Sequence, residues 1–168
     1  MGGMVLQWVA SAVPERIKSA VAVTPVPACG VPNMESARKQ FLLTAGDSPQ
    51  GLATFFMGGT ANRHNPAWAR SMAEKSLAAT DPEVYSKYTA AWADTNFVQK
   101  VLGVRLPLKV LVGEHDALTV EIMRQTILTW FPKSEIEVLS NCGHYPMFEI
   151  PINLATVCQA FMTQHSGR

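Results

Sequence analysis

The sequence predicts an α/β fold, in which a parallel sheet is flanked by helices and interrupted by an all-helical insertion. Short apolar runs without alternation, such as Val110–Val112, are typical of strands buried on both faces of a parallel sheet. Helical patterns separate these runs, and a helical crossover is the usual connection between parallel strands. The stretch 28–103 has helical patterns but no strand pattern, which indicates a helical region set apart from the sheet.

The first two predicted elements are a helix and a strand. Apolar residues recur at helical spacing between residues 3 and 12, at Met4, Val5, Trp8, Val9 and Ala12. Pro14 lies just beyond the expected end of this helix. Ile17–Thr24 is predicted to be a buried strand, which Pro25 and Pro27 prevent from continuing.

The predicted insertion contains several helical patterns joined by turns rich in glycine, proline and asparagine. These patterns cover residues 34–43, 50–56, 66–79 and 82–101. Methionine and aromatic side chains are frequent in this region. Such a composition is consistent with ordinary packing between helices, and also with the lining of a site for an apolar acyl or ring-bearing substrate.

Two strand–helix pairs follow the insertion. Val110–Val112 is a short apolar strand that ends at Gly113, and residues 119–130 have an amphipathic helical pattern. The remaining elements are a strand at 134–140, a loop at 141–147 and a helix at 151–164. This order of elements predicts parallel strands joined by helical crossovers.

Composition and charge exclude several classes of function. The chain has 168 residues, of which 48% are hydrophobic and 16% charged, as expected for a globular domain with one core. Its formal net charge is +1 and it has no basic block, which argues against nucleic acid or an anionic membrane surface as a partner. No apolar run reaches the roughly 20 residues of a membrane-spanning helix.

The cysteines indicate a reducing compartment. Cys29, Cys142 and Cys158 are an odd number without a Cys-x-x-Cys spacing, so neither a disulfide framework nor a zinc cluster is expected. Residues 10–12 resemble the cleavage site of a signal peptide, but no lysine or arginine precedes the apolar stretch. We therefore expect a cytoplasmic protein, with a secreted lipase-like protein as the alternative.

Two polar residues follow neighbouring predicted strands. Asp116 comes after the strand at 110–112, and His144 comes after the strand at 134–140. Reactive groups collect at the carboxyl ends of the strands in an open parallel sheet, and one helix and one strand separate these two residues. A carboxylate that orients an imidazole makes the imidazole an effective general base. We therefore expect Asp116 and His144 to meet.

Less specific roles exist for the same residues. Asp116 could simply cap the next helix, although Thr119 could do so instead. His144 could be a loop histidine with a structural hydrogen bond. Cys142 lies too close to His144 along a tight loop to form an efficient nucleophile–base pair with it, and the side chain of His115 is expected to face solvent.

The loops that contain these residues resemble those of the α/β-hydrolase fold family. Gly113–Asp116 resembles the Gly-x-x-Asp turn that follows a strand in this family, and Gly143–Pro151 resembles its histidine loop, with a glutamate and a proline after the histidine. The resemblance implies that Asp116 is the acid and His144 the base of a catalytic triad.

The same resemblance implies how the chain is divided. Residues 1–27 and 104–168 correspond to the C-terminal portion of the α/β-hydrolase core, and residues 28–103 to its helical cap or lid. The opening Met1–Gly3 resembles the nucleophile turn of the family, in which many members have Ser-Met-Gly-Gly. The backbone N–H of Met1 would then contribute to the oxyanion hole, and the two glycines would allow close packing of helix and strand.

On this resemblance, the nucleophile and the first five strands of the family's sheet lie outside the sequence. A base and an acid without a nucleophile cannot form an acyl-enzyme. The strand at 17–24 would be an exposed apolar edge, which invites pairing with another chain. We therefore expect self-association, a complementing N-terminal fragment, or a longer chain whose start codon has been misassigned.

These inferences predict a hydrolase that acts on a carboxylic ester or similar acyl bond of a small, mostly apolar substrate. No metal and no organic cofactor are expected. The nucleophile could be serine, aspartate or cysteine, and an aspartate would make the protein a relative of epoxide or haloalkane hydrolases. In an alternative from another class, the chain is a non-catalytic remnant that acts as a binding or assembly module.

Overall fold

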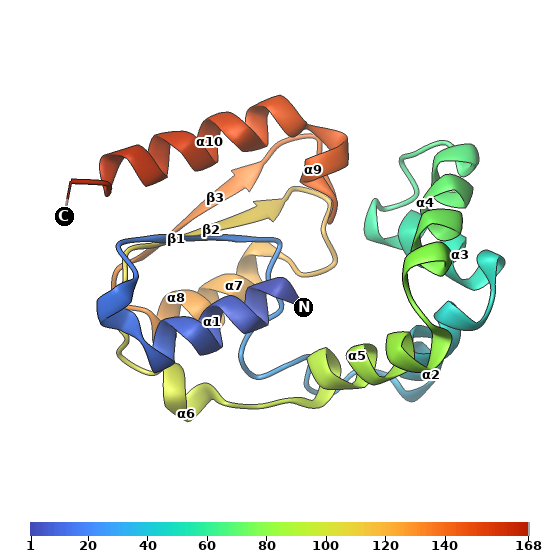
Figure 1. Ribbon diagram of the computed structural model, residues 1–168, viewed down its shortest axis with the longest axis horizontal. Helices are drawn as coiled ribbons and strands as arrows, with labels where there is room; N and C mark the ends of the chain where they lie inside the picture. The colour runs from blue at the N-terminus through green and yellow to red at the C-terminus, as the bar shows by residue number, and fades with distance from the viewer. Residues whose placement is uncertain (168) are drawn as a thin grey trace. The chain divides into compact units, whose positions relative to one another are not determined.

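The computed structural model describes residues 1–167, which divide into two compact units (Figure 1). The first unit combines residues 1–29 with the chain from Asn96 onward, and it contains the sheet. The second unit is Gly30–Thr95, and every regular element in this range is a helix.

Residues 1–167 contain one sheet, whose three parallel strands have the order β1–β2–β3. The strands are β1 (Ala20–Val23), β2 (Leu108–Gly113) and β3 (Ser134–Leu139). β2 and β3 pair over their whole length, and Gly113 is the partner of Leu139. The two strands therefore end at the same level, and the loops that follow them leave the sheet side by side. The predicted parallel arrangement is confirmed.

Helices cover both faces of this sheet (Figure 1). The helix α10 (Pro151–Gln164) lies on one face, and the other face is covered by α1 (Gly2–Ala12), α7 (Val120–Gln125) and α8 (Ile127–Trp130). β2 is buried between these layers, and its Leu111 packs with Leu139 and Cys142 beneath α10. Within residues 1–167, no helix has both the length and the apolar character needed to cross a membrane.

Two predicted elements are shorter or broken in the structure. β1 begins at Ala20 rather than at residue 17, and Thr24 leaves the strand with a φ of 41°. The helix predicted over residues 119–130 is divided at Thr126, where φ is −118° and ψ is −95°. The hydroxyl of Thr126 donates a hydrogen bond to the carbonyl of Ile122, a contact that often bends a helix.

The helical unit consists of helices that begin at recognisable sequence signals. Its elements are α2 (Ser36–Thr44), the 3₁₀ turn Ala45–Asp47, α3 (Pro49–Gly59), α4 (Pro66–Ala79) and α5 (Pro82–Asp94). Each of the last three helices starts with a proline, and the side chain before it accepts backbone N–H groups of the first turn: Ser48, Asn65 and Asp81. A polar cap followed by proline is a favoured helix start.

The boundary of the helical unit differs from the prediction of 28–103. The helix expected over residues 82–101 is two helices, because the chain is extended at Thr95 before α6 (Val98–Val101) begins. α6 belongs to the sheet unit, where Phe97 packs edge-to-face on Trp8 with ring centroids 5.1 Å apart. This aromatic contact with α1, together with the hydrogen bond from the N–H of Gly103 to the carbonyl of Trp130 at 2.8 Å, holds the segment after Thr95 to the sheet unit.

Gln7 is a buried polar residue on α1 that holds the segment after β1. Its amide nitrogen donates to the carbonyls of Gly3 and Val26, both at 2.8 Å, and its amide oxygen accepts the N–H of Ala28 at 3.0 Å. Val26 and Ala28 are themselves buried, so water does not substitute for the amide. Gln7 thereby fixes the path by which the chain leaves the sheet.

We predict that Gln7→Leu lowers the free energy of unfolding by about 3 kcal/mol, because it leaves a buried N–H and a buried carbonyl without partners. Urea denaturation followed by tryptophan fluorescence measures the change. Gln99→Leu is the matched control, since Gln99 is exposed on α6, and it should shift the stability by less than about 0.5 kcal/mol. Equal stability of the two variants would contradict this role of Gln7.

Candidate active site

Asp116 and His144 are joined by a hydrogen bond at the carboxyl edge of the sheet. Asp116 lies in the loop after β2 and His144 in the loop after β3. The Nδ1 atom of His144 is 2.9 Å from Oδ2 of Asp116. Their side chains differ in exposure, at 2% for Asp116 and 29% for His144. The acid is thus enclosed while part of the imidazole faces outward.

The carboxylate of Asp116 is satisfied on both oxygens. Oδ2 contacts His144, and Oδ1 accepts the backbone N–H of Leu118 at 3.0 Å. The cap of α7 is Thr119, whose hydroxyl oxygen accepts the N–H of Ile122. Asp116 therefore does not serve as the cap of that helix, and its second oxygen is left for the imidazole.

The contact with Asp116 determines which nitrogen of His144 can accept a proton. A carboxylate only accepts hydrogen bonds, so in the neutral imidazole Nδ1 holds the proton and Nε2 has the lone pair. Within residues 1–167, Nε2 has no hydrogen-bond partner. The arrangement can therefore take a proton at Nε2 from a group brought to it, and Asp116 would stabilise the resulting imidazolium.

The two loops are held together by their main chains. The N–H of Glu114 donates to the carbonyl of Leu139 at 3.0 Å, and the N–H of His115 donates to the carbonyl of Cys142 at 2.9 Å. Gly113 ends β2 against this second loop, and a Cβ atom at Gly113 would overlap with the carbonyl oxygen of Gly143. Only glycine fits at this position, which brings the loops of Asp116 and His144 close together.

Thr24 is a further residue at this edge, and no pattern in the sequence predicts its contact with the histidine loop. Its N–H donates to the carbonyl of Leu111 at 2.8 Å, and its hydroxyl donates to the carbonyl of His144 at 3.1 Å. The positive φ of Thr24 is rare for a β-branched residue. No sequence signal marks such a residue, because both the backbone conformation and the contact depend on the other two strands.

Met1 lies at the same edge of the sheet, but it is not bonded to the pair. A Cβ atom at Gly3 would overlap with Pro25, so α1 begins directly against the residue that follows Thr24. Gly2, by contrast, has open space around it. Within residues 1–167, no hydrogen bond connects Met1 with Asp116 or His144. Partial burial lowers the pKa of the Met1 amino group below its usual value.

His115 and Cys142, which lie close to the pair along the chain, make other contacts. The side chain of His115 is partly exposed, and its nearest carboxylate is that of Glu114, 3.9 Å away. Cys142 is fully buried, and its sulfur lies 3.2 Å from the carbonyl oxygen of Gly143 and 3.9 Å from Glu149. The Cys142 sulfur therefore contacts other groups than the imidazole of His144.

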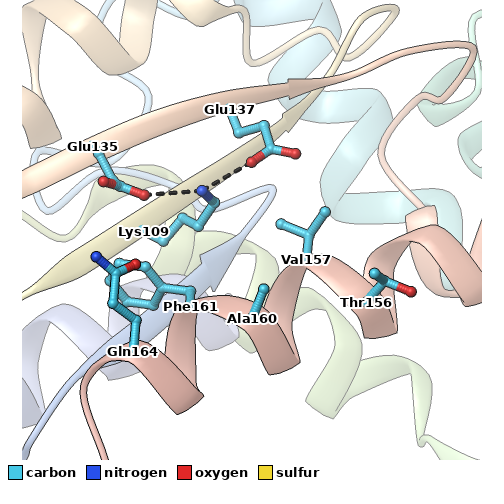
Figure 2. A pocket seen from close by; sticks show the side chains of 8 residues that line it. All are labelled: Lys109, Glu135, Glu137, Thr156, Val157, Ala160, Phe161 and Gln164. Carbon is cyan, nitrogen blue, oxygen red and sulfur yellow. Dashed lines mark hydrogen bonds and ion pairs between the residues drawn. The ribbon is translucent and has the colours of Figure 1, made fainter.

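A second polar cluster lies between the sheet and α10, in a hollow of about 230 Å³ (Figure 2). Lys109 of β2 contacts Glu135 at 2.9 Å and Glu137 at 2.8 Å, both on β3. Burial lowers the pKa of Lys109, but the hydrogen bonds to the two glutamates outweigh it, and the pKa lies above its usual value. The ammonium group of Lys109 thus has two carboxylate partners within the fold.

No group of three or more histidine, cysteine, aspartate or glutamate residues within residues 1–167 is arranged to hold a metal ion. No protein-family model matches the chain, and no curated protein matches it. Solved structures, however, do resemble it.

The chain is similar to bromoperoxidase from Bacillus anthracis, with a TM-score of 0.80, 16% identity, and coverage of 97% of this chain and 64% of that one. It is also similar to 2-hydroxy-6-oxo-6-phenylhexa-2,4-dienoate hydrolase from Rhodococcus sp. strain RHA1, with a TM-score of 0.75, 17% identity, and coverage of 97% and 61%. Est816, an N-acyl homoserine lactone degrading enzyme, gives a TM-score of 0.72, 20% identity, and coverage of 95% and 64%.

These similarities show the fold of the chain. The sheet, its flanking helices and their order match those of α/β-hydrolase fold proteins, so the chain has the α/β-hydrolase fold and the prediction of this fold is confirmed. The chain spans about three fifths of the length of these solved structures.

We predict that Gly113→Ala lowers the free energy of unfolding by about 3 kcal/mol, because the added methyl group meets main-chain atoms that cannot move independently. Gly58→Ala is the control, since a Cβ atom there has open space within α3, and it should leave the stability unchanged or raise it by up to about 1 kcal/mol. Urea denaturation measures both variants. A Gly113→Ala variant as stable as the parent would show that the two loops are not packed as described.

Proposed function

We propose that this chain provides the base and the orienting acid of a hydrolase that cleaves a carboxylic ester or similar acyl bond. The observation that supports this proposal is the 2.9 Å hydrogen bond between a buried carboxylate and an imidazole whose other nitrogen has no partner within residues 1–167. The general hydrolase character of the solved structures with this fold agrees with it.

In the proposed mechanism, His144 first accepts a proton and then donates it in each half-reaction. A nucleophile hydroxyl, proposed to be that of a serine, gives its proton to Nε2 as its oxygen attacks the acyl carbon. The tetrahedral intermediate then collapses, and the leaving alkoxide takes that proton from Nε2. Water repeats both steps on the acyl-enzyme and releases the carboxylic acid. The carboxylate of Asp116 stabilises the imidazolium, and the nitrogen of Met1, which is an amino group in this chain, is proposed to donate an N–H to the oxyanion.

We further propose a small, mostly apolar substrate. Est816 degrades an N-acyl homoserine lactone, and the Rhodococcus enzyme is named for hydrolysis of a phenyl-substituted dienoate. The helical unit contains a cluster of aromatic side chains, in which Phe55, Phe56 and Trp68 pack edge-to-face in sequence. Phe41 and Tyr88 of the same unit remain exposed. These apolar side chains are suited to contact an acyl chain or a ring of the substrate. The helical unit is therefore proposed to act as the lid.

We predict that His144→Ala reduces ester hydrolysis by about 10³-fold or more, and that Asp116→Asn does so comparably, because the acid and the base act as a unit. Release of p-nitrophenol from p-nitrophenyl butyrate measures the rate. The assay is run on the 168-residue chain by itself, and on the chain mixed with a second polypeptide that presents a serine at the end of a strand.

His115→Ala is the matched control for this experiment. Among residues 1–167, the carboxylate of Asp116 bonds Leu118 and His144 and not the imidazole of His115, so this variant should retain more than half of the rate. Hydrolysis that survives His144→Ala, or the absence of hydrolysis both with and without the second polypeptide, would contradict the proposed function.

A second candidate function is assembly through β1 and α1. Backbone N–H groups of Ala20 and Thr24 donate toward β2, so by alternation those of Val21 and Val23 point away from it, and within residues 1–167 no strand pairs with that edge. On α1, apolar side chains also face outward, with Val5 at 53% exposed. An apolar edge beside an apolar helix face is suited to association with a second copy of this chain.

We predict that the purified chain sediments as a dimer or larger species, and that Val5→Lys combined with Val9→Lys weakens this association by at least tenfold, because two charges would be buried in the contact. Sedimentation velocity over a range of concentrations measures it. Ile152→Lys places a lysine at an apolar position on α10 that is 83% exposed, and it should leave the association unchanged. A parent chain that is monomeric throughout would contradict assembly.

A further inference from the structure

We infer that Glu149 is a positioning residue that holds the main chain of His144, so that the imidazole stays directed at Asp116. Both oxygens of its carboxylate are used: Oε2 accepts the N–H of Gly143 at 2.9 Å, and Oε1 accepts the N–H of Tyr145 at 3.0 Å. These are the two residues on either side of His144. The catalytic consequence of this contact rests on the proposed function, whereas the contact itself does not.

The position of Glu149 follows from a short helix that begins two residues after His144. Tyr145 is the N-cap of this helix, α9 (Pro146–Glu149), and the N–H of Glu149 donates to the carbonyl of Tyr145 at 2.9 Å. Side chains of a helix are inclined toward its N-terminus, so the carboxylate of Glu149 reaches back to the N–H groups that precede the helix. The carboxylate of Glu149 thus joins the residues on the two sides of His144.

The main chain around His144 is irregular, so these N–H groups do not take part in the hydrogen bonding of the sheet. Neither Gly143 nor Tyr145 belongs to a strand, and Asn141 just before them has a left-handed conformation with a φ of 56°. On the opposite side, the carbonyl of His144 accepts the hydroxyl of Thr24. The peptide groups next to the imidazole are therefore fixed on two sides. A rotation of either group would turn Nδ1 away from the 2.9 Å contact with Asp116.

Glu114 provides a comparison within the same pair of loops. Its Oε2 atom accepts the N–H of Asn141 at 2.8 Å, so a single oxygen of this carboxylate bonds the histidine loop. A glutamine at position 114 can keep that bond with its amide oxygen. A glutamine at position 149 cannot keep both, because its NH₂ group is a donor and would face another N–H group. The same chemical change is thus tolerated at one position and disruptive at the other.

The test compares Glu149→Gln with Glu114→Gln by two NMR measurements that require no catalysis. The ¹⁵N shifts of the His144 ring report its tautomer, which we expect to be held with the proton on Nδ1 in the parent chain and in Glu114→Gln. In Glu149→Gln we expect a mixture of tautomers and at least tenfold faster hydrogen exchange at the amide of Gly143 or Tyr145. Where ester hydrolysis is measurable, kcat should fall by at least tenfold with little change in KM.

The parent tautomer and parent amide protection in Glu149→Gln would overturn the inference. If that variant does not fold, the parent chain decides: amides of Gly143 and Tyr145 that exchange at the rate of an open loop overturn the inference, and protected amides support it. The two proposals fail separately. If Glu149→Gln shows a mixture of His144 tautomers but the parent shows no ester hydrolysis, the proposed function is overturned and the role of Glu149 is supported. If Glu149→Gln hydrolyses the ester as fast as the parent, the proposed function is supported and the role of Glu149 is overturned.

Discussion

The buried carboxylate of Asp116 is the constraint on which the carboxyl edge of the sheet depends. An ionised carboxylate at 2% exposure is costly unless hydrogen-bond donors surround it, and here the donors are the N–H of Leu118 and the imidazole of His144. To bring that imidazole within 2.9 Å, the loop after β3 must lie against the loop after β2. The matched register of the two strands makes this possible, because Gly113 and Leu139 end them at the same level.

The two polar clusters of the sheet unit differ in whether their polar atoms all have partners within the fold. Lys109 is bonded by both Glu135 and Glu137, so its charge is compensated within the fold and the cluster stabilises the contact between strands beneath α10. His144 is bonded at one nitrogen and partly exposed at the other. A polar group that the fold orients but does not fully satisfy is the kind of group that chemistry can use. This difference, rather than the presence of charge, distinguishes a candidate active site from a structural cluster.

The sequence was sufficient to predict the parallel sheet and the meeting of Asp116 with His144, and the reason is that both depend on local patterns. The apolar run at 110–112 and the single strand–helix interval between the two residues contain that information. What could not be predicted depends on contacts between distant segments. The break at Thr126 and the left-handed Thr24 have no pattern of their own, and α6 joins the sheet unit through distant contacts such as that of Phe97 with Trp8. α1 begins beside the carboxyl end of β1 through the packing of Gly3 on Pro25, a contact that the glycine alone does not specify.

The two outer strands of the sheet differ in charge: β3 carries charged side chains and β1 has none. β3 presents Glu135 and Glu137 on the face toward α10, and charges that point inward at a sheet edge discourage pairing with another strand. β1, by contrast, is the sequence Ala-Val-Ala-Val and has no charge at all. Within residues 1–167, the sheet is therefore protected at one edge and receptive at the other. The receptive edge lies beside the apolar outer side of α1 and ends at Thr24, whose hydroxyl donates to the backbone carbonyl of His144, so a strand added there would extend the sheet on the side of the loop that carries His144.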